Sequence, residues 1–209
     1  MKALPIALLT ASLAVVPAAH AKQYPPRDEC IADTSLAAFV TNLKDVVRRK
    51  DAKALLAMTA PDIEFELGDS ATRAGFAKEW KLDKPATSGL WKELGTVLAD
   101  GCSLDKDGGS APYWYAHGPN VDAGEDGVIS GERVNLRASP SKTGKVLRTV
   151  DWESVTIGAE TDSGFTEVTL SDGTKGYIAN DFIWNGYGYR ALFQKRGGKW
   201  MITAFLAGD

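Results

Sequence analysis

Histidine and cysteine are scarce in this chain, and their scarcity excludes several kinds of chemistry. The 209 residues contain two histidines and two cysteines. His20 lies in the apolar N-terminal segment, so His117 is the one histidine in the rest of the chain. The cysteines are Cys30 and Cys102, far apart in sequence. A structural zinc site needs four such ligands at characteristic short spacings. The sequence therefore has no zinc signature, and we expect neither a metal nor a cofactor.

A basic surface of the kind that binds nucleic acid is also missing. The chain has 24 lysines and arginines against 27 acidic residues, a net charge of −3, and its basic residues do not cluster. Binding to a phosphate backbone depends on such a cluster. Beyond the N-terminal segment there is also no apolar run of the roughly 20 residues that a membrane-spanning helix needs. We therefore expect no nucleic-acid partner and no membrane span in the mature protein.

The N-terminal segment has the pattern of a secretory signal peptide. A short positively charged end is followed by the mostly apolar run 3–16, and Ala19 and Ala21 put small residues before a cleavage point. The apolar run is too short for a comfortable membrane span, which makes an anchor the less favoured alternative. We expect a signal peptide over 1–21, a mature chain that begins at Lys22, and a periplasmic or secreted protein.

The two cysteines are best interpreted as a disulfide. An exported protein meets an oxidising compartment, where a lone pair of cysteines forms a disulfide more often than a metal site or a nucleophile. We therefore predict a bond between Cys30 and Cys102 that ties the N-terminal arm to the end of a predicted helix.

The N-terminal half of the mature chain has the apolar spacing of helices. Thr34 or Ser35 can cap a helix that runs to about Arg49, because its apolar residues recur three and four apart. Asp51 can cap a second, short helix. The same patterns predict further elements, namely helices over 75–80 and 89–98 and a strand over 113–115.

Three carboxylates alternate with apolar residues after the second helix. Asp62, Glu64 and Glu66 share one face of a predicted strand, and the apolar residues share the other. A cation site or a general acid–base pair is one interpretation of such a row. A solvated strand face is the interpretation that we favour, because alternation alone produces such rows.

An acidic segment with two glycines, 120–127, is predicted to be a linker. Its carboxylates are those of Asp122, Glu125 and Asp126. Their spacing does not match the calcium loop of an EF-hand, so a solvated linker is favoured over a calcium site.

The segment after this linker carries the most specific pattern in the chain. It opens with Val-Asn-Leu-Arg over 134–137, and Ser-Pro-Ser over 139–141 turns the chain away. An Asp-Gly turn at 172–173 precedes Gly-Tyr-Ile over 176–178. The segment resembles the bacterial SH3-like (SH3b, SH3 type 3) domain, which implies a small SH3-like β-barrel over 128–185.

The resemblance implies a binding module. SH3b domains bind peptides or cell-wall fragments and are often attached to an enzyme. Here the Cys–His pairing of NlpC/P60 peptidases is absent, and so is a Gly-x-Ser-x-Gly elbow. The first hypothesis is therefore a non-enzymatic periplasmic binding or adaptor protein whose partner is a peptide, a protein or a peptidoglycan fragment. The sequence leaves enzymatic activity open and favours its absence.

The rest of the chain is predicted to form a second unit. Two strand-like runs surround Gly197 and Gly198, and a lone hairpin is only marginally stable in water. We expect this hairpin to pack on the N-terminal helices and to bury Phe193, Trp200 and Ile202. The predicted fold class is therefore α+β, a small SH3-like β-barrel plus an N-terminal helical or α+β lobe completed by a C-terminal hairpin. The predicted domains are 22–120 with 186–209 for that lobe and 128–185 for the barrel.

The order of helices and strands in the N-terminal lobe faintly resembles NTF2-like cone folds. That resemblance implies a second hypothesis, an enzyme or a small-ligand binder with a pocket in this lobe. Carboxylates such as Asp62 or Glu64 would then do the chemistry. A buried carboxyl with a raised pKa in a deep pocket would favour this hypothesis.

Three aromatic residues are candidates for a ligand site on the barrel. Trp152 lies between Asp151 and Glu153, in a turn where SH3b domains commonly have glycine, and those acids prefer water. Tyr177 and Trp184 lie in or at the end of later strands. We expect a groove near Trp152, Tyr177 and Trp184 that holds an extended peptide or glycan-peptide and suits basic groups. The alternative is that Trp152 and Trp184 pack against the N-terminal lobe and join the two lobes.

Overall fold

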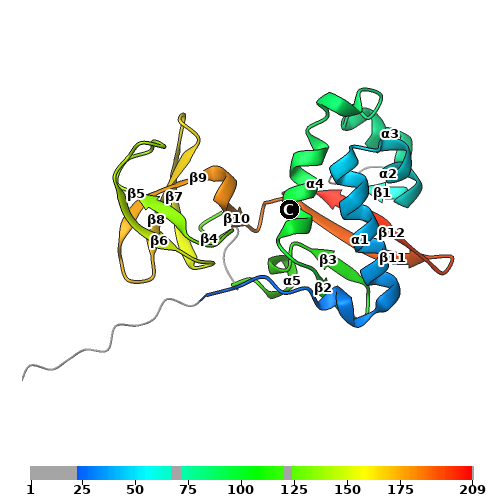
Figure 1. Ribbon diagram of the computed structural model, residues 1–209, viewed down its shortest axis with the longest axis horizontal. Coiled ribbons are helices and arrows are strands. Elements are labelled where there is room, and N and C mark those ends of the chain that lie inside the picture. Colours follow the sequence, from blue (N-terminus) through cyan, green and yellow to red (C-terminus); the bar gives the residue numbers. More distant parts are fainter. Residues whose placement is uncertain (1–22, 67–71, 120–123, 209) are drawn as a thin grey trace, which may run out of the picture.

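The computed structural model describes residues 23–66, 72–119 and 124–208 (Figure 1). It contains helices and two separate β-sheets, which confirms the predicted α+β class. None of the described helices is long and apolar enough to cross a membrane. The predicted signal peptide, 1–21, lies outside the described residues.

The first lobe is built on a five-stranded sheet in the order β1-β12-β11-β3-β2. Strands β1 and β12 are parallel, and the other neighbours are antiparallel. Its elements are η1 (Glu29–Ala32), α1 (Thr34–Arg49), α2 (Ala52–Met58), β1 (Thr59–Glu64), α3 (Arg73–Glu79), η2 (Pro85–Thr87), α4 (Leu90–Ala99), β2 (Ser103–Leu104), β3 (Gly109–Ala111), α5 (Trp114–His117), β11 (Arg190–Arg196) and β12 (Lys199–Leu206).

Helix α1 shows how the apolar pattern becomes structure. Its cap is Asp33, whose carboxylate accepts hydrogen bonds from the amides of Ser35 (2.8 Å) and Leu36 (3.1 Å). The predicted cap, Thr34 or Ser35, is therefore wrong by one or two residues. The helix ends at Arg49, and the next residue, Lys50, closes it in a left-handed conformation. The predicted apolar stripe is buried in the core, and its buried members are Leu36, Val40, Leu43, Val46 and Val47.

The C-terminal hairpin of β11 and β12 lies in the middle of the first sheet. Strand β11 pairs with β3 and β12 pairs with β1, so both outer neighbours come from the part of the chain that precedes the second lobe. Phe193 and Ile202 are buried in the core that α1 and α4 share with this hairpin. Trp200 is only half-buried, and its indole N–H donates to the Ser35 hydroxyl (2.9 Å).

The second lobe is a seven-stranded antiparallel sheet in the order β10-β4-β7-β8-β9-β5-β6. Strands β10 and β6 are its edges, so the described pairs do not close it into a barrel. It has an aliphatic core of its own, which includes Leu136, Val168 and Ile178. Its elements are β4 (Asp126–Ile129), β5 (Val134–Arg137), β6 (Val146–Val150), β7 (Ser154–Thr161), β8 (Phe165–Leu170), β9 (Lys175–Ala179), η3 (Asn180–Phe182) and β10 (Ile183–Asn185).

The predicted strand over 113–115 is wrong. The chain forms the short helix α5 there, closed by a hydrogen bond from the Gly118 amide to the Trp114 carbonyl (2.8 Å). Consecutive aromatic residues favour strands when they fit a half-buried sheet face. Here Trp114 is instead buried between the two lobes, so tertiary packing overrides the local preference.

The predicted linker over 120–127 also ends earlier than expected. Asp126 and Gly127 belong to β4, which pairs with β7 on one side and β10 on the other. A Cβ atom at Gly127 would lie 2.6 Å from the Trp184 carbonyl oxygen, so the absence of a side chain permits this close pairing. Asp122 lies outside the described residues.

The predicted disulfide between Cys30 and Cys102 is present. Backbone hydrogen bonds flank it, from the Cys102 amide to the Arg27 carbonyl (2.9 Å) and from the Glu29 amide to the Cys102 carbonyl (2.7 Å). The bond therefore fastens the N-terminal arm, 23–28, to the segment that follows α4.

Candidate functional site: a cavity between the two lobes

An aromatic cluster joins the two lobes. Trp114 of α5 packs against Trp184 of β10, with ring centroids 6.0 Å apart. Tyr113 and Val128 are buried with Trp114 in this cluster. The half-buried side chains of Tyr24, Trp152 and Trp184 pack around these three residues, and we call the whole group the junction cluster.

The N-terminal arm crosses this junction. The Tyr24 amide donates to the Trp152 carbonyl (2.8 Å), and the Trp114 indole N–H donates to the Tyr24 carbonyl (2.6 Å). Gln23 forms an isolated β-bridge with Glu153. One residue of the arm is therefore hydrogen-bonded to both lobes.

The structure brings together two of the three predicted ligand residues. Trp152 and Trp184 both belong to the junction cluster, which is the arrangement expected if they join the lobes. Trp152 has a φ of 47°, a left-handed conformation that explains why a glycine suits this turn. Tyr177 lies on β9, paired with Arg137 and Glu167, and is not part of the cluster. A groove that uses all three stays a prediction.

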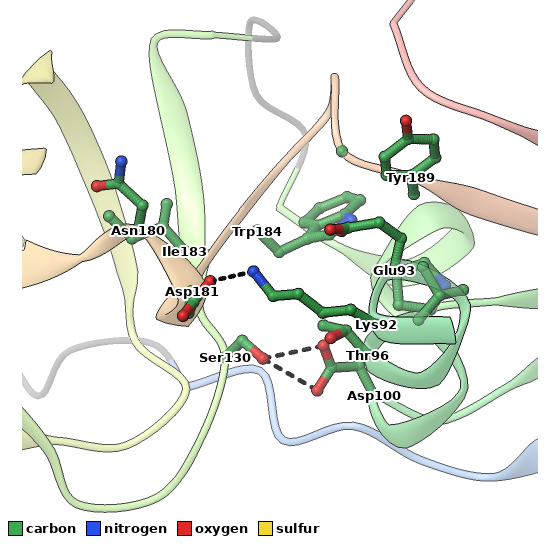
Figure 2. A pocket seen from close by; sticks show the side chains of 13 residues that line it. Lys92, Glu93, Thr96, Asp100, Ser130, Asn180, Asp181, Ile183, Trp184 and Tyr189 are labelled. Carbon is green, nitrogen blue, oxygen red and sulfur yellow. Dashed lines mark hydrogen bonds and ion pairs between the residues drawn. The ribbon is translucent and has the colours of Figure 1, made fainter. Parts of the chain in front are cut away.

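A cavity of about 370 Å³ lies beside the junction cluster (Figure 2). Helix α4 and its end form one wall, the second lobe forms the other, and the segment that leads into β11 adds a third side. The lining residues include Lys92, Glu93, Thr96 and Asp100 from the first wall, Ser130, Asp181 and Trp184 from the second, and Tyr189 from the third.

Two polar contacts cross this cavity from one lobe to the other. The Lys92 ammonium lies 2.8 Å from the Asp181 carboxylate, and both side chains are largely exposed. Such an exposed ion pair contributes at most about 1 kcal/mol, so it can open at little cost. The second contact joins Ser130, which follows β4, to Asp100 at the C-terminal end of α4, and Figure 2 shows both.

Asp100 is a cavity carboxyl that is hydrogen-bonded across the lobe boundary. Its two oxygens lie 3.0 and 2.9 Å from the Ser130 hydroxyl, which can donate to one of them at a time. Burial raises the pKa of Asp100 from 3.8 to about 6, although the hydrogen bond from Ser130 acts in the opposite direction. The carboxyl therefore changes charge in a pH range where ordinary aspartates stay ionised.

This raised pKa predicts how stability depends on pH. Between pH 4 and 6 the folded protein keeps a proton that the unfolded chain has already released, so stability falls as the pH rises through this window. Asp100→Asn removes the titration and keeps an acceptor for Ser130. The free energy of unfolding of the variant minus that of the native protein should therefore be larger at pH 7 than at pH 4, by about 2–3 kcal/mol.

Urea unfolding at both pH values measures this difference. Asp162→Asn, at an exposed aspartate in the β7–β8 turn, is the matched control and should leave the pH profile unchanged. Parallel profiles for Asp100→Asn and the native protein would contradict the assignment.

The carboxylates that the sequence singled out lie elsewhere. Asp62 and Glu64 are exposed on β1, and Glu66 is exposed just after it, while Ile63 is buried. This is the solvated face favoured from the sequence. Asp126 accepts a hydrogen bond from the Thr156 hydroxyl (3.1 Å) on the neighbouring strand.

The described ranges contain no group of three or more free side chains placed to bind a metal ion. The one grouping of close potential ligand atoms there joins Asp28 to Cys30 and Cys102, and the disulfide occupies both sulfur atoms. His117 lies 3.1 Å from the Glu29 carboxylate and faces no second histidine or free thiol among the described residues.

Asp100 and Ser130 were not among the residues that the sequence singled out. Neither belongs to a motif, and each looks like an ordinary polar residue at the end of an element. Their contact exists only because the lobes meet, so no local pattern could have indicated it.

Comparison of the chain with models of protein families, with curated proteins and with solved structures finds no match.

Proposed function

We propose that the protein is an exported, non-enzymatic binding or adaptor protein that holds a peptide or a cell-wall fragment. In this proposal the SH3b-like second lobe does not act alone. Its face beside β10 and helix α4 of the first lobe together form the binding site. Export to the periplasm is supported by the signal-peptide pattern over 1–21 and by the Cys30–Cys102 disulfide.

The observation that carries this proposal is the cavity between the lobes. Binding sites for small molecules occur preferentially at domain interfaces, combine aromatic walls with a few polar groups, and occupy about 300–1,000 Å³. This cavity has a volume of about 370 Å³, an aromatic residue from each lobe, Tyr189 and Trp184, and polar groups from both lobes. Trp184 is also one of the residues assigned to ligand binding from the sequence.

The strands of the second lobe are compatible with the SH3b-like assignment, and the described pairs leave the sheet open. Its short antiparallel strands follow the order of the sequence motif, with β5 at the Val-Asn-Leu-Arg segment and β9 at the Gly-Tyr-Ile segment. The Asp-Gly turn connects β8 to β9, and Gly173 there has a φ of 82°, which suits glycine. The lobe also buries a core of its own.

One observation favours the alternative, an enzyme or small-ligand binder based on the first lobe. Asp100 belongs to that lobe, and its pKa of about 6 is one that a general acid or base would need. Asp62 and Glu64, the carboxylates first considered for this role, are exposed on β1. Incubating the protein with cell-wall fragments and analysing them by mass spectrometry tests this alternative, and cleavage that Asp100→Asn abolishes would support it.

Filling the cavity tests the proposed function. Thr96 is an exposed residue of α4 on the cavity wall, so Thr96→Trp puts an indole into the cavity without disturbing the core. We expect this variant to bind soluble peptidoglycan fragments at least tenfold more weakly than the native protein in calorimetric titration. Thr41→Trp is the matched control, because Thr41 is an exposed threonine of α1 that does not line this cavity.

Equal binding by Thr96→Trp and the native protein would show that the ligand binds elsewhere. Absence of binding by the native protein to peptides and to peptidoglycan fragments alike would refute the proposed function.

A further inference from the structure

Asp100 is a partly buried carboxylate that lacks a counter-ion. The Ser130 hydroxyl is the one side-chain donor to it in the described part of the chain, and no described basic residue forms an ion pair with it. An ionised carboxylate can accept about four hydrogen bonds. Asp100 therefore has unused acceptor capacity on the wall of the cavity.

The other charged groups around the cavity leave it negative. Glu93 and Asp181 add two carboxylates to that of Asp100, and Lys92 is the one basic residue among the lining residues described. Lys92 already pairs with Asp181. Arg27 lies on the N-terminal arm, and its side chain is exposed. The part of Arg27 that approaches Gly101, next to Asp100, is its backbone carbonyl.

Tyr189 supplies an apolar wall to the same space. Burial, with smaller contributions from Glu93 and Glu79, raises the pKa of Tyr189 above its ordinary value of 10, and a tyrosine hydroxyl is neutral at physiological pH even without this shift. Its ring stacks on Phe205 (5.1 Å between centroids) and packs against Trp80 (5.5 Å). The ring is therefore held in place beside the acidic groups.

We propose that the ligand of this cavity carries a primary ammonium group, which binds the Asp100 carboxylate beside Ser130. This inference rests on the proposed function, because it assigns a chemical class to the ligand of the same cavity. The ammonium supplies the counter-ion and the hydrogen-bond donors that Asp100 lacks. The carbon chain next to the ammonium lies against Tyr189 and Trp184.

Two sources can supply this ammonium, the side-chain amine of a diamino acid in a cell-wall stem peptide and the N-terminus of a free peptide. Both bind Asp100 only when it is ionised. Asp100 is about nine-tenths ionised at pH 7 and about one-tenth at pH 5, given its pKa of about 6. The affinity for an ammonium ligand should therefore fall about tenfold between these pH values.

Calorimetric titration with matched probes tests this inference. The first pair is a disaccharide tripeptide whose one free amine belongs to a lysine side chain, and the same fragment with that amine acetylated. The second pair is tetra-alanine with a free N-terminus and its N-acetylated form. We expect at least one free amine to bind tenfold more tightly at pH 7 than its acetylated partner, and the pair that shows this difference identifies the source.

Two variants connect the effect to Asp100. Asp100→Asn should lose the preference for the free amine and the dependence on pH, whereas Asp162→Asn should keep both. In the native complex, NMR titration should also find the pKa of Asp100 lower than in the free protein.

The outcomes separate this inference from the proposed function. Equal binding of the free and acetylated forms would overturn the ammonium assignment and leave the cavity as a binding site. If none of the four probes binds, the proposed function fails and this inference fails with it.

Discussion

Replacing Trp114 with alanine is expected to lower the free energy of unfolding by about 4 kcal/mol, which is typical of removing a large buried aromatic side chain. Trp114 is 1 % exposed, and its ring packs against Trp184 across the lobe junction. Its indole N–H also donates to the Tyr24 carbonyl (2.6 Å). The substitution therefore removes packing between the lobes and one of the hydrogen bonds that hold the N-terminal arm.

The same substitution should separate the unfolding of the two lobes. Each lobe has its own apolar core, and Trp114 lies in the smaller cluster between them. We expect Trp114→Ala to broaden the thermal transition or to divide it into two. It should also weaken ligand binding, because Trp184 contacts Trp114 and forms part of the cavity wall.

Trp114→Phe is the matched control. It keeps an aromatic ring in the cluster and loses the hydrogen bond to Tyr24, so it should cost only about 1–2 kcal/mol. Urea unfolding and calorimetry measure both variants. A loss below 1 kcal/mol for Trp114→Ala would mean that the junction contributes little to the stability of the protein.

Removing the disulfide is expected to cost a similar amount. Cys30 and Cys102 are separated by 72 residues, and the chain-entropy relation for a loop of this length gives about 4 kcal/mol. The bond also holds the arm against the segment after α4, where two backbone hydrogen bonds flank it. The double variant Cys30→Ala/Cys102→Ala should therefore unfold at a clearly lower urea concentration.

Reduction of the native protein provides an independent measurement. Native protein treated with a reducing agent should lose stability by about the same amount, and the double variant should not respond to that reagent. Native protein that unfolds at the same urea concentration with and without the reducing agent would show that the disulfide adds nothing to stability. Both cysteines are buried, so alanine is preferred to serine, which would leave a buried hydroxyl to be satisfied.

Both substitutions should affect the proposed function, because the candidate site depends on the relative position of the lobes. The arm links the disulfide to the junction cluster through Tyr24, and the cavity lies beside that cluster. Loosening the arm should therefore reduce ligand affinity even though neither cysteine touches the cavity.

The sequence by itself determined the local elements whose pattern repeats within a few residues. The apolar stripe of α1, the extent of α4 and the burial of Ile63 between exposed carboxylates all follow from periodicity. The disulfide also followed from the sequence, since a chain with two cysteines allows only one pairing within it. Periodicity reports on neighbouring residues along the chain, so it indicates where these elements lie and which of their faces are apolar, but not what those faces pack against.

Only the tertiary structure decided the candidate site. Ser130 meets Asp100 although 30 positions separate them, and Lys92 meets Asp181 across 89 positions. The helix at 114–117 and the strand that begins at Asp126 also formed against their local patterns, because packing between the lobes and pairing with β7 and β10 outweighed local preference. The raised pKa of Asp100 has the same origin, since burial against the second lobe removes water from a carboxyl that would otherwise be solvated. Contacts of this kind depend on how two separately folded surfaces fit, which a single sequence does not encode in any local pattern.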